Sequence, residues 1–177
     1  MTYDNDIKIA SDFPSREKKI AVDGTENIDP ESIRKGAILG EICAKEYIKS
    51  AKDNGPGADM EDSWELFSQR AVLLSFAVVS CFEKSLNSDY ASAAKTTFFG
   101  YLKSQDPTLY AAASDNGALS FYYLAFRRGN DLERSIGQTF AMLCSHDGDP
   151  VYQELGEAIY CWFTSVVKEK IESCEKA

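Results

Sequence analysis

The stretch Ala-Val-Leu-Leu-Ser-Phe-Ala-Val-Val at residues 71–79 decides the fold class of this chain. Wound at 3.6 residues per turn, it is apolar on every side, and a helix without a polar face must be surrounded by other elements. The wider apolar run, residues 71–82, is interrupted by two serines and is shorter than the ~20 residues that cross a bilayer. We therefore expect a buried central helix over about residues 62–86.

The segments on either side carry the start and stop signals of further helices. Asp-Pro pairs at residues 29–30, 106–107 and 149–150 place a capping carboxylate before a proline at the first helical position. Asp131 is a further predicted cap, and Gly129 a predicted helix end. No stretch alternates in period 2 long enough to build a sheet. The sequence predicts an all-α fold, an irregular bundle of about six to seven helices.

Two finer features bear on how these helices pack. Gly36 and Gly40 lie one turn apart, which costs helix propensity and predicts the close approach of a partner helix. Short matches also recur at spacings of 42 to 45 residues, which favours two or three stacked helical hairpins as an alternative to the irregular bundle. The matched segments are Leu74-Ser75-Phe76 with Leu119-Ser120-Phe121, Thr97-Phe98 with Thr139-Phe140, and Asp106-Pro107 with Asp149-Pro150.

Length and composition indicate one helical domain preceded by an arm. The 177 residues fit a single domain, and 44% hydrophobic with 27% charged residues is a globular composition. Residues 1–28 mix charges with single apolar residues and show no helical period. We expect them to form an N-terminal arm, and residues 29–177 to form the helical domain.

The net charge indicates which partners are disfavoured, and the cysteines indicate the compartment in which the protein is expected. A formal charge of −9 disfavours nucleic acid and anionic membrane surfaces as partners. The five cysteines are odd in number and show no Cys-x-x-Cys spacing, which is typical of free thiols in a reducing compartment. The first residues lack the basic and apolar regions of a signal peptide. We expect a cytoplasmic protein without a cofactor.

The aromatic residues of the second half provide a candidate interaction surface. Neighbouring residues on a helix point about 100° apart, so Tyr122 and Tyr123 cannot both face one core. Exposed tyrosine beside arginine is typical of binding surfaces, and Arg127 and Arg128 follow directly. The two arginines also fit a structural role, because cations stabilise a helix C-terminus.

Two carboxylate pairs provide a competing hypothesis. Glu61 with Glu65, and Glu154 with Glu157, each share one face of a predicted helix. Facing each other between helices, they would supply the oxygen ligands that a divalent metal prefers. Acidic residues in a first helical turn equally stabilise the helix dipole, so the pairs need not mark a site.

The single histidine, His146, lies two residues after Cys144 and raises the question of a Cys–His nucleophile. Residues two apart on a helix point away from each other, and no third residue to orient the histidine is evident. The sequence therefore favours a non-enzymatic helical domain that binds another protein or a second copy of itself. The alternative is a small-molecule binder or a divalent-metal-dependent hydrolase that uses the paired carboxylates.

Overall fold

The structure is a computed structural model that describes residues 29–53, 55–57, 64–129 and 131–176. These residues form seven α-helices and no strand, which confirms the predicted all-α class. The helices are α1 (Pro30–Asp53), α2 (Trp64–Ser85), α3 (Ser88–Gln105), α4 (Pro107–Ala113), α5 (Asn116–Arg128), α6 (Leu132–Leu143) and α7 (Pro150–Glu175). The predicted N-terminal arm, residues 1–28, lies outside the described residues.

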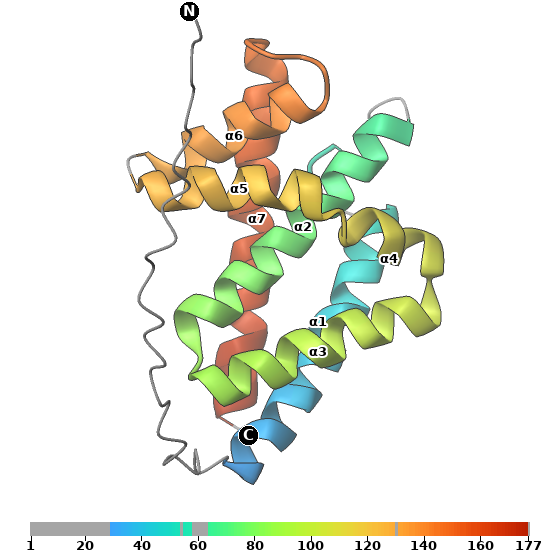
Figure 1. The fold of residues 1–177 in the computed structure, drawn as a ribbon, viewed down its shortest axis with the longest axis vertical. Helices are drawn as coiled ribbons and strands as arrows, with labels where there is room; N and C mark the ends of the chain where they lie inside the picture. Colours follow the sequence, from blue (N-terminus) through green and yellow to red (C-terminus); the bar gives the residue numbers. More distant parts are fainter. Residues whose placement is uncertain (1–28, 54, 58–63, 130, 177) are drawn as a thin grey trace, which may run out of the picture.

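Helix α2 occupies the centre of the bundle and contacts every other described helix (Figure 1). Every residue from Arg70 to Phe82 is buried. Arg70 donates hydrogen bonds to the Ala51 and Pro56 carbonyls, and beyond it the segment is apolar apart from two serines. By length and hydropathy α2 alone among the described helices could cross a membrane, and 78% of that apolar window is buried inside the fold. Its apolar surface is therefore covered by other helices.

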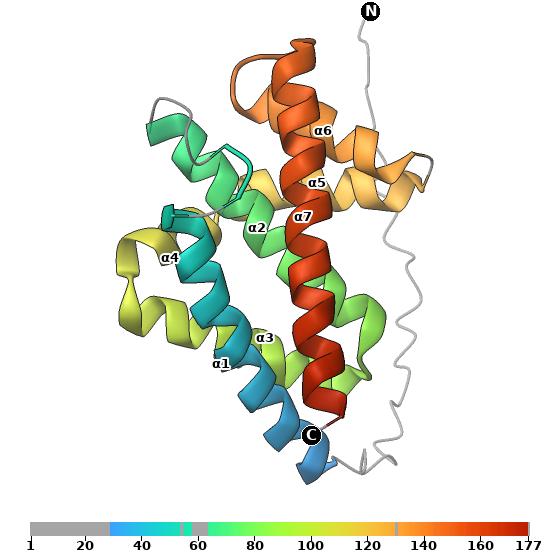
Figure 2. The same ribbon diagram turned by 180° about the vertical axis from the view of Figure 1, so that it is seen from behind.

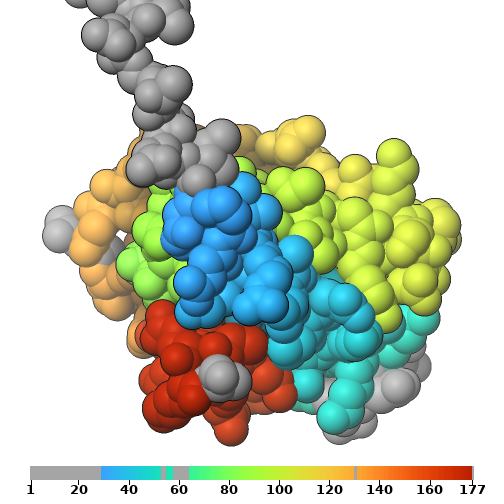
Figure 3. All heavy atoms as spheres, turned by 90° about the horizontal axis from the view of Figure 1, so that it is seen from below, coloured from blue at the N-terminus to red at the C-terminus, as the bar shows by residue number. Residues whose placement is uncertain are grey.

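Helices α1 and α3 pack side by side through the two glycines of α1. A Cβ at Gly36 would lie 2.6 Å from the Tyr90 carbonyl oxygen, and one at Gly40 would collide with the Ala94 carbonyl oxygen. The predicted close approach is thus present, and α3 is the partner. Seen from below in Figure 3, α1 (blue) lies between α3 and the end of α7 (red).

A second glycine contact joins α6 to α7, the helix that runs the length of the molecule in Figure 2. A Cβ at Gly137 would collide with the Gln153 carbonyl oxygen, and one at Gly156 would lie 2.6 Å from the Cβ of Phe140. Both residues are buried, so the two backbones approach without intervening side chains. This contact holds α6 against α7.

The predicted helix ends are largely present, with one correction. Asp29, Asp106 and Asp149 cap α1, α4 and α7 by accepting hydrogen bonds from first-turn N–H groups. Asp131 occupies the N-cap position of α6, but its side chain makes no capping hydrogen bond and its φ is 48°. Gly129 ends α5 in the left-handed region at φ 71°, as expected.

The matched segments do not occupy equivalent environments. Phe98 and Phe140 are both fully buried, whereas Phe76 is buried and its counterpart Phe121 is 46% exposed. Helix α3 packs most extensively on α1, while α6 packs on α7. The helices that follow the two Asp-Pro pairs also differ, since α4 has 7 residues and α7 has 26. The matched segments therefore do not form repeated structural units of equal length and packing.

Candidate interaction surface

The structure corrects the expected role of Tyr122. This side chain is fully buried, and its ring stacks on Phe76 of α2 with centroids 5.4 Å apart. Tyr123 is half-buried, contacts Phe76 edge-on and donates its hydroxyl to Glu83 at 3.4 Å. This face of α5 turns toward α2 because it carries the aromatic residues that complete the core. Tyr122 therefore cannot belong to an interaction surface.

The opposite face of α5 is the one that exposes apolar side chains. Phe121 and Leu124 lie one turn apart and are 46% and 51% exposed. Met142, near the end of α6, is 40% exposed and lies beside them. Only seven large apolar side chains of the described residues are exposed to this degree, and three of them meet here. Such convergence is typical of a docking surface.

A groove of about 350 Å³ runs between α5 and α6 under these side chains. The two helices are antiparallel across a short connection, as Figure 1 shows. Arg128 therefore lies at the connected end of the groove, and Asp147, beyond the end of α6, lies at the other end. The other lining residues are uncharged: Ala125 from α5, and Ser135, Gln138 and Thr139 from α6.

Of the two arginines that end α5, only one lines the groove. Arg127 and Arg128 are both exposed in the last turn of the helix, where cations stabilise the dipole. Arg128 lines the groove beside Leu124, whereas Arg127 is not among the residues that line it. Of the four residues predicted for the surface, the groove therefore contains Arg128, while Tyr123 lies on the other side of the helix.

Phe121, Leu124 and Met142 were missed by the sequence interpretation. Helix α5 is apolar on two faces, one with Ala118, Tyr122 and Ala125 and the other with Phe121 and Leu124. A helix with a single partner needs only one such face, so this pattern was the available signal. The interpretation instead weighted tyrosine and arginine by residue type.

The carboxylate pairs do not form a metal-binding group in the part of the chain that is described. Glu61 lies outside it. Glu65 accepts a hydrogen bond from the Ser145 hydroxyl at 2.8 Å, Glu154 is exposed, and Glu157 is half-buried beside Gly137. Among the described residues, no three Asp, Glu, His or Cys side chains gather as metal ligands.

Cys144 and His146 do not form a nucleophilic pair. Burial, together with the nearby Glu65 carboxylate, raises the pKa of the Cys144 thiol to about 12. At neutral pH the thiol therefore stays protonated, and the thiolate is the form that attacks an electrophile. His146 instead stacks on Tyr152, with ring centroids 3.7 Å apart. The arrangement does not activate Cys144.

Comparisons of the chain with protein-family models, with curated proteins and with solved structures gave no match. The described residues thus form seven α-helices and expose three large apolar side chains around the groove between α5 and α6.

Proposed function

We propose that the protein is a non-enzymatic interaction domain and that the groove between α5 and α6 is its docking surface. The observation that supports this most directly is the meeting of Phe121, Leu124 and Met142 on one groove. Burying an exposed apolar side chain contributes about 1.5–3 kcal/mol. These three side chains are exposed in the single chain, so a partner that covers them would gain the free energy of burying all three.

The partner that best fits this groove is a second copy of the same chain. The groove carries Arg128 at one end, Asp147 at the other and apolar side chains between them. A two-fold axis through its middle places Arg128 of each copy opposite Asp147 of the other, while the apolar residues meet at the centre. A two-fold interface requires this kind of self-complementary pattern. A groove with one charge sign throughout would be repelled by its own copy.

The test is the mass of the protein in solution, compared between two matched variants. Wild type is expected to shift from the 19.6 kDa monomer toward twice that mass as its concentration rises from about 1 to 100 µM, as measured by sedimentation velocity. L124E places a charge in the groove and is expected to weaken the dimer by at least about thirtyfold. I38E is the control, because Ile38 is also 51% exposed but lies on α1.

Charge reversal tests the two-fold arrangement itself. R128E and D147R are each expected to weaken the dimer by about tenfold, because each sets like charges against each other at both ends. The double variant restores opposite charges and should recover most of the wild-type affinity. A wild type that stays monomeric at about 100 µM, or equal effects of L124E and I38E, would overturn the proposal.

A further inference from the structure

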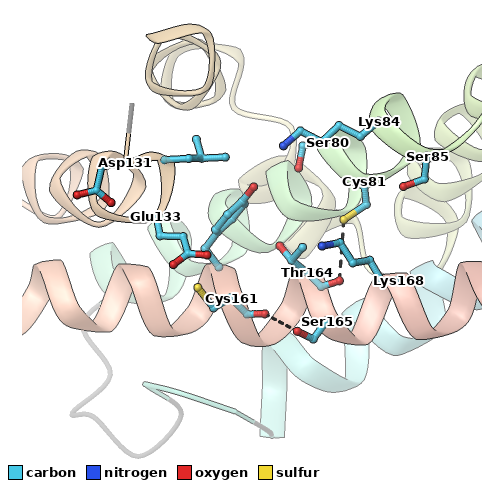
Figure 4. Close-up of a pocket in the computed structure, with 12 residues that line it drawn as sticks. Ser80, Cys81, Lys84, Ser85, Asp131, Glu133, Cys161, Thr164, Ser165 and Lys168 are labelled. Carbon is cyan, nitrogen blue, oxygen red and sulfur yellow. Dashed lines mark hydrogen bonds between the residues drawn. The ribbon is translucent and has the colours of Figure 1, made fainter. Parts of the chain in front are cut away.

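A second concavity lies on another side of the molecule, between α2, the start of α6 and the middle of α7. Its volume is about 390 Å³, within the range of pockets that hold small molecules. Most of the side chains that line it are charged or carry a hydroxyl group (Figure 4). It shares no lining residue with that groove, so the two are independent surfaces.

The charges of this pocket are separated by sign. Figure 4 shows Asp131 and Glu133 at one end, and Lys84 and Lys168 at the other, with both ammonium groups directed toward the middle. Asp131 and Glu133 come from the start of α6, while Lys84 ends α2 and Lys168 lies on α7. The acidic and the basic residues therefore line different ends of the pocket.

Within the described residues these four side chains make no ion pair. The ion pairs found there within 4.0 Å involve other residues. Lys84 lies over the Phe126 ring at 4.3 Å, a cation–π contact that leaves its N–H groups free to donate elsewhere. The protein thus holds two positive and two negative groups around one hollow without pairing them to each other.

Hydroxyl groups occupy the wall between the charged ends. The Oγ1 atom of Thr164 is buried and has no hydrogen-bond partner among the described residues. The Tyr160 phenol also lines the pocket; burial raises its pKa, and its hydroxyl lies close to those of Ser80 and Thr164. A buried hydroxyl without a partner costs free energy that a bound polar molecule can recover.

We propose that this pocket binds a small zwitterion that carries a primary ammonium and a carboxylate, the chemistry of a free amino acid. The carboxylate would lie toward Lys84 and Lys168, and the ammonium toward Asp131 and Glu133. A simple anion is disfavoured because it meets two carboxylates, and a simple cation because it meets two lysines. A molecule with both charges satisfies both ends, and Thr164 and Tyr160 offer hydroxyls between them.

The first experiment measures the melting temperature with defined probes at about 10 mM. The probes are the L-amino acids and the longer 4-aminobutyrate and 6-aminohexanoate, which vary the distance between the two charges. At least one is expected to raise the melting temperature by about 3 °C, the shift for a dissociation constant near 1 mM. Its N-acetyl derivative, which lacks the ammonium, and its amide, which lacks the carboxylate, should each give no shift.

The second experiment assigns the binding to this pocket. K168Q and E133Q are each expected to weaken the active probe by at least about tenfold in calorimetric titration, because each removes one charged contact. Lys168 and Glu133 are exposed, so both variants should keep the wild-type circular dichroism spectrum. K103Q is the control, because Lys103 is exposed on α3 and lies outside the pocket.

The outcomes separate clearly. Binding of an intact amino carboxylate that both blocked derivatives and both pocket variants lose supports the proposal. Absence of any shift over the whole set overturns it, and so does equal binding of a blocked derivative. Unchanged affinity in K168Q and E133Q would also overturn it. None of these results depends on whether the α5–α6 groove forms a dimer.

Discussion

Helices α1 and α3 pack backbone against backbone, which we call the closed contact, whereas a groove remains between α5 and α6. In the first pair, Gly36 and Gly40 bring the α1 backbone against α3, and a Cβ at either position would collide with it. In the second, Phe121, Leu124 and Met142 lie around a groove that the described residues do not fill. Small residues therefore complete the α1–α3 contact within the fold, whereas large apolar side chains stay exposed where α5 meets α6.

The largest expected effect comes from opening the closed contact. G40A places a methyl group against the Ala94 carbonyl oxygen, which is backbone and cannot rotate away. The variant should lose about 3 kcal/mol of unfolding free energy, or roughly 6–12 °C in melting temperature. G100A is the matched control, because Gly100 is exposed on α3 with no atom near its added Cβ. That variant should gain about 0.5–1 kcal/mol from helix propensity; equal losses would contradict the close approach.

A smaller effect is expected from Cys43, whose thiol is on the buried face of α1. Burial raises the pKa of Cys43 to about 12, while a thiol in an unfolded chain ionises near pH ~8.5. Above about pH 9 the unfolded state releases a proton that the folded state keeps, so stability falls as pH rises toward 12. C43A should flatten this slope by up to about 1.4 kcal/mol per pH unit in urea unfolding between pH 8 and 10.5. Identical slopes in wild type and variant would refute the assignment.

The smallest effect compares two fully buried tyrosines, one on each side of the molecule. Tyr47 of α1 donates its hydroxyl to the Ala71 carbonyl at 2.8 Å, whereas the Tyr122 hydroxyl has no partner among the described residues. Y47F should cost about 1 kcal/mol, because it removes a satisfied hydrogen bond. Y122F should be neutral or stabilising by up to about 1 kcal/mol, since it removes an unsatisfied polar group. Chemical denaturation measures both, and similar losses would contradict the distinction.

The sequence predicted local features of the fold more completely than contacts between distant segments. The apolar stretch at residues 71–79 identified the central helix, because a helix without a polar face must be surrounded by other helices. Capping by Asp106 and Asp149 was also predictable from neighbouring residues. The close approach at Gly36 and Gly40 was expected, but its partner α3 was not, because pairing depends on the packing of the whole bundle.

The candidate site was predictable only in part. Helical spacing required only that Tyr122 and Tyr123 not both face the core, and the structure buries Tyr122 against Phe76 and leaves Tyr123 half-buried. Arg128 does line the groove, but Met142 comes from another helix and has no signal within α5 that links it to Leu124. The left-handed backbone of Asp131, at φ 48°, was not predicted either, although aspartate adopts this conformation more readily than most residues.

The central position of α2 has a consequence for the order of events during synthesis. This helix is long and apolar enough to resemble a membrane-spanning segment, and α7, which covers part of it, ends 90 residues further along the chain (175 − 85). At about 5–20 residues per second, a ribosome takes roughly 5–20 s to make that interval. During this time α2 lacks its final cover, so part of its apolar surface stays in contact with water until α7 has been made.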